Sequence, residues 1–162
     1  MCIYKIIYII LMLKVGLIGC GQWGKNLIRE FNNLKVLNSI CDLNENLLED
    51  YKKKYPNIKT TNDWNTVLND DTINCVCISL PSELHYSFAK KSLLSGKDVF
   101  VEKPITLNIN EAEELIEIAK KHNKILMVGH ILHYNPAVEK IKEIINEGKI
   151  GKIKNIISKA HP

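Results

Sequence analysis

The sequence has few of the residues that mark fibrous, linker-like or metal-binding proteins. Eight glycines and five prolines among 162 residues are too few for a fibrous chain or an extended linker. The sequence contains no Cys-x-x-Cys pair, and its five histidines do not follow the spacing of a zinc site. We therefore expect a globular protein without a bound metal.

The apolar stretch at the N-terminus is short. Residues 1–13 read MCIYKIIYIILML, which is shorter than the roughly 20 residues that a membrane-spanning helix needs. A secretory signal would require a small-residue cleavage site, and Lys14-Val15-Gly16 offers none. Met12 stands just before a strong strand pattern. We interpret residues 1–12 as an N-terminal extension, hypothesise that translation starts at Met12, and expect no membrane partner.

Charge and composition favour one ordinary globular domain. The chain is 46% apolar and 25% charged, with a net charge of +4, and its length suits a single hydrophobic core. The densest basic run is Lys52-Lys53-Lys54, followed by Lys59. It lacks the clustering or recognition motif of a nucleic-acid surface, so we interpret it as a solvated helix face and expect no nucleic-acid partner.

The cysteines point to a reducing compartment. Their number, five, is odd, and Cys75 and Cys77 lie two apart in an apolar run, where they would share one face of a strand. We interpret the cysteines as reduced, buried thiols of a cytoplasmic protein.

From Leu13 onward, short apolar runs alternate with longer amphipathic stretches, which predicts strands alternating with helices. The predicted strands are residues 13–18, 36–41, a short one near Ile58, 72–80, 99–101, 125–128 and 153–157. The predicted helices are residues 23–34, 44–55, 64–68, 84–94, 110–122 and 136–147. This alternation predicts an α/β fold, a doubly wound parallel sheet with helices on both faces.

The first strand-to-helix turn carries a glycine pattern. Gly19-Cys20-Gly21-Gln22-Trp23-Gly24 is a G-x-G-x-x-G that follows a predicted strand and opens a predicted helix. Gly19 allows a tight turn, Gly21 lets the backbone approach a pyrophosphate, and Gly24 lets helix and strand pack closely. The helix N-terminus then offers free N–H groups to the phosphates. The alternative is a glycine-rich turn without a ligand.

An acidic residue follows at the spacing of a ribose ligand. Asp42 ends the second predicted strand, 23 residues after Gly19. A carboxylate there can accept hydrogen bonds from both ribose hydroxyls of an adenosine, and it would repel a 2′-phosphate. We therefore expect NAD as the cofactor in preference to NADP. The alternative is that Asp42 caps the helix that follows.

Two further loops follow strands that should end at the same edge of the sheet. Ser79-Leu80-Pro81 comes after the fourth strand, with His85 one turn into the next helix, and Glu102-Lys103-Pro104 comes after the fifth. An adjacent acid and base at a strand's carboxyl end can contact both cofactor and substrate. The alternatives are a helix-surface or core role for His85, and a surface ion pair beside a turn proline. Lys103–Pro104 is a candidate cis bond, because X-Pro bonds tolerate that isomer.

Three ordered stretches resemble the Gfo/Idh/MocA family of NAD(P)-dependent oxidoreductases: VGLIGCGQWG, SLPSELHYSFAKKSLLSGKDVFVEKP and MVGHILHYNPAV. The resemblance covers residues 13–162. It implies a Rossmann domain, with hydride transfer between nicotinamide C4 and a carbinol carbon of a sugar or nucleotide sugar, and Lys103 as the catalytic residue beside the reacting hydroxyl. It also implies a set of cofactor-binding residues: Gly19, Gly21, Gln22, Trp23, Gly24, Asp42, Ser79, Leu80, Pro81, His85, Glu102 and Lys103.

The resemblance also sets the expected domains. Residues 13–130 would form the Rossmann domain, and residues 131–162 would begin a second α/β domain with a large open sheet, most of which would be missing. Gly129 to Pro136 resembles members that oxidise UDP-linked N-acetylamino sugars at the 3-hydroxyl. On this basis Lys103, His130, Tyr134 and Asn135 are the candidate substrate-binding residues.

A missing substrate domain leaves three hypotheses. The first is a fragmentary dehydrogenase that binds NAD but turns over little. The second is half of a split enzyme, whose partner chain carries the sheet domain. The third is a non-catalytic NAD-binding module, for which we expect cofactor binding without substrate-dependent reduction.

Overall fold

The structure is a computed structural model that describes residues 13–157. The chain divides into two compact units, Met1–Gly129 and His130–Pro162. The N-terminal extension that we expect at residues 1–12 lies outside the described residues. Between residues 13 and 157, no helix is both long enough and apolar enough to cross a membrane.

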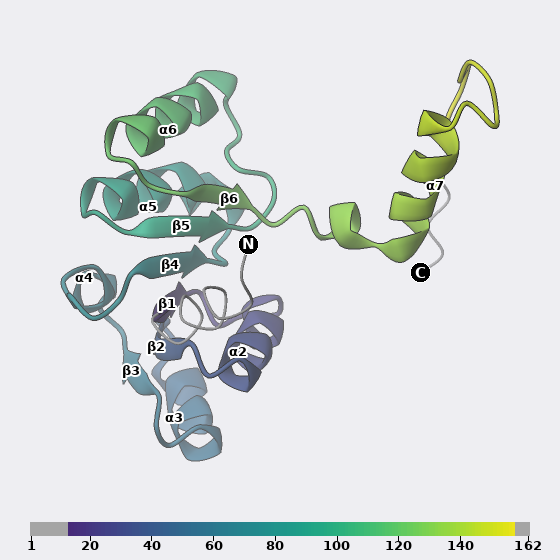
Figure 1. Ribbon diagram of the computed structural model, residues 1–162. Helices are drawn as coiled ribbons and strands as arrows, with labels where there is room; N and C mark the ends of the chain where they lie inside the picture. The colour runs from purple at the N-terminus through teal and green to yellow at the C-terminus, as the bar shows by residue number, and fades with distance from the viewer. Residues whose placement is uncertain (1–12, 158–162) are drawn as a thin grey trace. The chain divides into compact units, whose positions relative to one another are not determined.

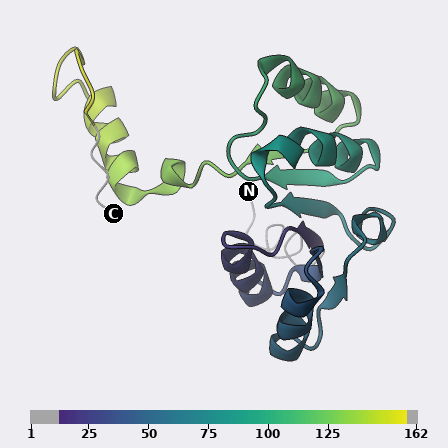
Figure 2. The ribbon, with the colours of Figure 1, turned by 180° about the vertical axis from the view of Figure 1, so that it is seen from behind.

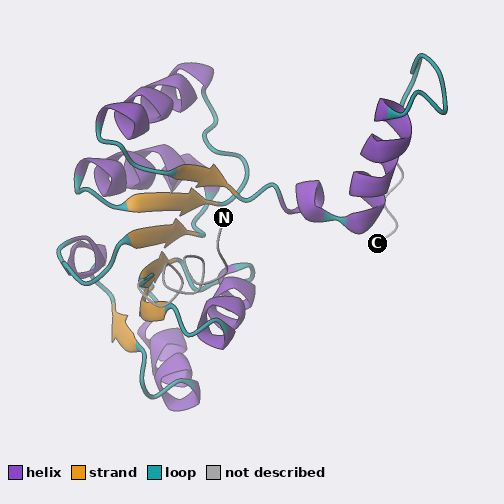
Figure 3. Cartoon of the chain, in the orientation of Figure 1, coloured by secondary structure: helices purple, strands orange, loops and turns teal. Residues whose placement is uncertain are grey.

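The first unit is built on a six-stranded sheet whose neighbouring strands are all parallel (Figures 1 and 3). The strand order is β3-β2-β1-β4-β5-β6. The strands are β1 (Val15–Ile18), β2 (Leu37–Cys41), β3 (Lys59–Thr61), β4 (Cys75–Ile78), β5 (Asp98–Val101) and β6 (Leu126–Val128). This confirms the predicted fold class, a Rossmann-type doubly wound α/β sheet.

Helices cover both faces of this sheet (Figure 2). They are α2 (Gly24–Asn33), α3 (Glu45–Lys54), α4 (Trp64–Leu68), α5 (Ser82–Leu94) and α6 (Ile109–Lys121). Ile28 of α2 packs in one buried cluster with Leu17 of β1. Leu93 of α5 and Val76 of β4 belong to a second cluster. Neighbouring side chains of a strand point to opposite faces, so the strands supply apolar residues to both clusters.

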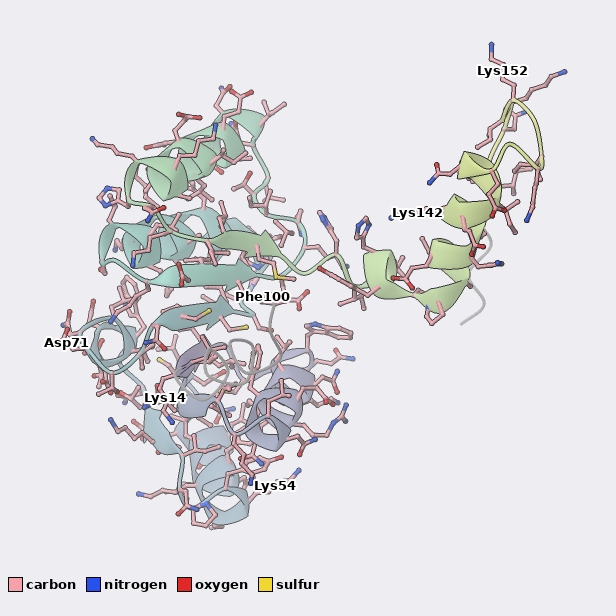
Figure 4. The ribbon with its side chains drawn as sticks, viewed as in Figure 1. Lys14, Lys54, Asp71, Phe100, Lys142 and Lys152 are labelled. Carbon is pink, nitrogen blue, oxygen red and sulfur yellow. The ribbon has the colours of Figure 1, made fainter. Side chains whose placement is uncertain are left out.

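The basic run lies at the end of α3. Lys52, Lys53 and Lys54 occupy the last turn of that helix and are exposed (Figure 4 labels Lys54). Positive charge at a helix C-terminus interacts favourably with the helix dipole. The run is thus a solvated helix face, as expected from the sequence.

The second unit is described from His130 to Ile157. It contains the 3₁₀ turn η1 (Ile131–Tyr134) and the helix α7 (Pro136–Asn146). Our prediction of a strand at residues 153–157 is wrong, because this segment has no strand structure and Ile156 and Ile157 are exposed. A strand needs a neighbour for its hydrogen bonds, and no described strand pairs with this segment. A run of isoleucines raises strand propensity without supplying that neighbour.

Candidate cofactor site

The candidate site lies where the strand order reverses, between β1 and β4. Ligands of open α/β sheets bind beyond the carboxyl ends of the strands at this point. Among the α-helices described, α2 and α5, which follow β1 and β4, have no side-chain cap at their N-termini. The other α-helices are capped by the side chains of Asn44, Asp63, Asn108 and Asn135. The two uncapped helix ends place backbone N–H groups and partial positive charge at the reversal point.

Each glycine of the Gly19–Gly24 loop has a different environment. Gly19 has a φ of +93°, and a Cβ there would overlap the carbonyl oxygen of Ser79. A Cβ on Gly24 would overlap the carbonyl oxygen of Gly19. Gly21 is exposed, and a Cβ there would meet nothing within 4 Å. Folding thus requires glycine at positions 19 and 24, whereas the open surface at Gly21 leaves room for a ligand to approach the backbone.

Asp42 is tied directly to this loop. Its Oδ2 accepts a hydrogen bond from the backbone N–H of Cys20 at 2.7 Å, and its Oδ1 accepts one from the N–H of Asn44 at 2.9 Å. Each carboxylate oxygen can accept more than one hydrogen bond. Asn44, not Asp42, caps α3 through the N–H of Leu47. The cap alternative for Asp42 is therefore incorrect, and the carboxylate lies fixed beside the backbone of the Gly19–Gly24 loop.

Glu102 connects the two sides of the reversal point. Its carboxylate is buried, and Oε1 accepts a hydrogen bond from the indole Nε1 of Trp23 at 2.6 Å. Oε2 lies 3.4 Å from the backbone nitrogen of Lys103. A Cβ on Gly129 would lie only 3.0–3.1 Å from the carboxyl group. The alternative of a surface ion pair between Glu102 and Lys103 is therefore incorrect, because Glu102 is held by an indole and packed against a glycine.

Lys103 follows the buried carboxylate and is exposed. The Lys103–Pro104 peptide bond is cis, as the sequence allows. Gln22 is also exposed, and Trp23 keeps 43% of its surface accessible. These side chains belong to loops that end at the carboxyl edge of the sheet, where a dinucleotide would lie.

The loop after β4 carries the next group of candidates. Ser79 and Leu80 are partly exposed and Pro81 is exposed, directly before α5. His85, one turn into α5, is only 1% exposed. Its ring nitrogens both face backbone carbonyl oxygens, Nδ1 that of Pro104 at 2.6 Å and Nε2 that of Leu80 at 2.8 Å. His85 is thus a core histidine whose two polar atoms are already in contact with the protein.

The remaining candidates lie in the second unit. His130 and Tyr134 are exposed. Asn135 caps α7 by accepting a hydrogen bond from the N–H of Ala137 at 2.9 Å. The structure does not place this unit relative to the first, so their contact with a substrate stays a prediction.

The thiols near the site are held in the neutral form. Burial, with the Asp42 carboxylate adding to it, raises the pKa of the Cys20 thiol well above its usual range. Burial and then Asp42 raise the pKa of Cys41 to about 11. A thiol that stays protonated is a poor nucleophile and a poor metal ligand. Within residues 13–157, no group of three or more His, Cys, Asp or Glu side chains could hold a metal ion.

Sequence reasoning missed two residues that support the site. The Tyr51 hydroxyl donates a hydrogen bond to the Cys20 carbonyl at 3.3 Å, from α3 to the Gly19–Gly24 loop. Gly129 leaves room for the Glu102 carboxylate. Tyr51 recurs one turn after Leu47 on the apolar face of α3, but this spacing predicts only burial. Nothing in the sequence signals that Gly129 abuts a residue 27 positions earlier.

Comparison with known proteins identifies a family. The family model GFO_IDH_MocA, described as an oxidoreductase family with an NAD-binding Rossmann fold, matches residues 13–130. An uncharacterized oxidoreductase of Streptococcus pneumoniae is 30% identical over 146 residues, which cover 88% of this chain and 38% of that protein. The chain thus spans about two fifths of the length of that curated relative.

Two solved structures resemble the fold. The myo-inositol 2-dehydrogenase of Lactobacillus plantarum superposes with a TM-score of 0.80 at 29% identity, covering 87% of this chain and 43% of that one. The scyllo-inositol dehydrogenase of Lactobacillus casei, solved with NAD(H) and scyllo-inositol, gives a TM-score of 0.80 at 25% identity, covering 86% and 42%. Both similarities cover most of this chain and under half of the solved one.

Proposed function

The chain belongs to the Gfo/Idh/MocA family of NAD(P)-binding oxidoreductases, and from this premise we propose that its first unit binds NAD(H) for hydride transfer to or from a carbinol carbon. The nicotinamide, when bound, supplies the hydride chemistry. The protein's part is to bind and orient the cofactor and to handle charge at the reacting oxygen.

One observation carries this proposal. A glycine loop opens an uncapped helix at the β1/β4 reversal point, and its middle glycine, Gly21, has open space around it. Packing and backbone conformation explain Gly19 and Gly24 but not Gly21. A pyrophosphate that lies against the loop backbone accounts for a glycine there, because any side chain would separate the two.

We propose that NAD is preferred over NADP, on the basis of Asp42. The carboxylate is fixed by two backbone N–H groups and keeps lone pairs for the ribose hydroxyls of an adenosine. A 2′-phosphate at that position would meet a negative charge with no basic side chain between Asp42 and Lys52 in the sequence. The expected discrimination is therefore electrostatic repulsion of NADPH.

We assign the polar chemistry of the site to the loop after β5. Lys103 stands at the carboxyl end of that strand with an exposed side chain. An ammonium there would stabilise a developing alkoxide, and a neutral amine would accept the proton of the reacting hydroxyl. Glu102, held by Trp23, would support the cofactor side of the same loop. Ser79, Leu80 and Pro81 would border the nicotinamide from the neighbouring loop.

For the substrate we propose a sugar or a cyclic polyol, because two of the solved structures that resemble this chain are inositol dehydrogenases. His130, Tyr134 and Asn135 would contact it from the second unit. The UDP-linked sugars suggested by residues 129–136 are a narrower form of the same proposal. A separate chain that carries an open-sheet domain would be the partner. The buried thiols favour a cytoplasmic location.

The test is cofactor binding to the purified chain. Trp23 lies in the site, so excitation of the indoles at Trp23 and Trp64 should transfer energy to the nicotinamide of bound NADH. We expect saturable NADH binding, weaker NADPH binding, and a roughly tenfold loss of NADH affinity, about 1.4 kcal/mol, in Asp42→Ala. The loss for NADPH should be smaller.

A matched control is Asp71→Ala. Asp71 is an exposed aspartate in the turn before β4, at the amino end of that strand (Figure 4). Its removal changes the net charge by the same amount and should leave NADH affinity unchanged. A folded wild-type chain that binds neither nucleotide would contradict the proposal, and equal losses in both variants would show a general charge effect.

A further inference from the structure

His85 is a buried titratable group to which the proposed chemistry gives no role. It lies on α5, whose other buried residues are Ala89, Ser92 and Leu93. Burying an imidazole in such a face is unfavourable unless its nitrogens find partners. Packing alone would be served as well by an apolar side chain of similar size. We therefore attribute the histidine at this position to the groups that its two ring nitrogens contact.

Those partners belong to two different loops of the site. Nδ1 contacts the carbonyl oxygen of Pro104 at 2.6 Å, and Nε2 contacts that of Leu80 at 2.8 Å. Pro104 directly follows Lys103, after β5, and Leu80 follows Ser79, after β4. One ring thus spans the gap between the ends of two neighbouring strands.

The Leu80 side of this link continues to the Gly19–Gly24 loop. The Ser79 carbonyl lies so close to Gly19 that a Cβ there would overlap it, and a Leu80 methyl would be 3.1 Å from that Cβ. The Pro104 side continues to Lys103 through one peptide bond. His85 therefore contacts the backbone of both loops, at Leu80 after β4 and at Pro104 after β5.

We propose that His85 is a positioning residue, which holds the Lys103–Pro104 backbone at a fixed distance from the Leu80 loop and does not touch the cofactor. The effect of this positioning on cofactor binding and catalysis rests on the proposed function. A neutral imidazole has one N–H, so it donates to one of the two carbonyls at a time, whereas a doubly protonated ring donates to both. In each case the ring fills the space between the loops.

Two substitutions separate the two contacts. His85→Asn places an amide N–H near the position of Nδ1 and keeps a donor for Pro104. His85→Gln places one near the position of Nε2 and keeps a donor for Leu80. Ser92→Ala is the control, since Ser92 is buried on the same helix and donates only to the Phe88 carbonyl, away from both loops.

The binding measurement compares NADH with ADP, which carries the adenosine and diphosphate but no nicotinamide. We expect His85→Gln to raise the Kd for NADH about tenfold and the Kd for ADP less than twofold. His85→Asn should keep most of the NADH affinity that His85→Gln loses. If the substitutions lower thermal stability but leave the NADH-to-ADP affinity ratio at the wild-type value, the role is only structural and the proposal is wrong.

The backbone measurement needs no cofactor, so it separates this proposal from the proposed function. Backbone order parameters of Lys103 and Ile105 in the free chain should fall from about 0.85 to below about 0.6 in His85→Gln. They should stay near 0.85 in His85→Asn and Ser92→Ala. Unchanged values in His85→Gln overturn the positioning role whether or not NADH binds. Equal NADH losses in both His85 variants with unchanged order parameters would instead show direct cofactor contact, which also overturns it.

Discussion

The two units of the chain differ in whether their apolar side chains are buried. In the first unit, Leu17, Val76 and Leu93 are fully buried between a sheet and its helices. In the second, none of the described residues is buried, and Ile141 and Ile157 are 54% and 84% exposed. Burial of apolar surface is the main source of stability. The comparison teaches that the first unit supplies its own core, so the proposed cofactor site rests on a self-supporting frame.

The largest expected difference between the units is in the cost of removing an apolar side chain. Leu17→Ala should lower the free energy of unfolding by about 3 kcal/mol, because it leaves a cavity in a fully buried cluster. Ile141→Ala in α7 should change it by less than about 0.5 kcal/mol, because that side chain is already largely in water. Urea unfolding of both variants measures the difference, and equal losses would break the comparison.

The second-largest expected effect is a loss of NADH affinity without a loss of folding stability. Gly21→Ala should weaken NADH binding about tenfold, or about 1.4 kcal/mol, because a methyl group would stand between the backbone and the pyrophosphate. Its unfolding free energy should change by less than about 0.5 kcal/mol, since a Cβ there meets nothing within 4 Å. Gly24→Ala is the contrast: a Cβ there overlaps the Gly19 carbonyl oxygen, so stability should fall.

Titration calorimetry and urea unfolding, run on the same samples, check both glycine variants. Unchanged NADH affinity in a folded Gly21→Ala chain would mean that no ligand approaches the backbone at this loop.

How much of this could be read from the sequence differs between the fold and the site. The strand-helix alternation and the order of the loops followed from hydrophobic periodicity, because each buried strand is followed by an amphipathic stretch. The start of β4 did not follow from hydrophobic periodicity. The sequence predicted a strand from Thr72, but the Asp70 carboxylate accepts a hydrogen bond from the Thr72 N–H at 2.9 Å and holds a turn there.

In the site, the sequence identified the loops but not the contacts between them. The bonds of Trp23 to Glu102 and of His85 to Pro104 join residues 79 and 19 positions apart. Such pairs depend on which strands become neighbours, and local patterns of propensity and charge carry no information about that. The strand expected at residues 153–157 failed for the same reason, since propensity does not supply a partner strand.

The third effect is a pH dependence in the first unit. Hydrogen bonds from Lys59 and then Thr72 lower the pKa of Asp70 to about 2. A carboxyl whose folded pKa is depressed stabilises the protein above its unfolded pKa, about 3.9, and loses this contribution as the pH falls through about 2. Asp70→Asn should therefore lower the melting temperature by a few degrees at pH 7.

The difference in melting temperature between Asp70→Asn and the wild type should shrink below about pH 4 and vanish near pH 2. Thermal unfolding from pH 2 to 7 measures it. Asp71→Asn is the neighbouring control, and a difference that stays constant across this range would exclude the linkage.

The smallest effect is expected in the second unit. The Lys140 ammonium pairs with the Glu143 carboxylate at 2.8 Å, and both side chains are about half exposed or more. Exposed helix pairs of this kind contribute about 0.3–0.5 kcal/mol at most. Lys140→Ala should therefore leave both the urea midpoint and NADH affinity within error of the wild type. A clear loss of NADH affinity would show that α7 takes part in cofactor binding.

The most direct test of the central claim is amide hydrogen exchange of the intact chain with and without NADH. If the first unit alone forms the cofactor site, bound NADH should slow exchange in residues 19–24, 42–44, 79–81 and 102–103, and leave residues 136–146 unchanged. Slower exchange confined to residues 136–146, or no change anywhere at saturating NADH, would contradict the account.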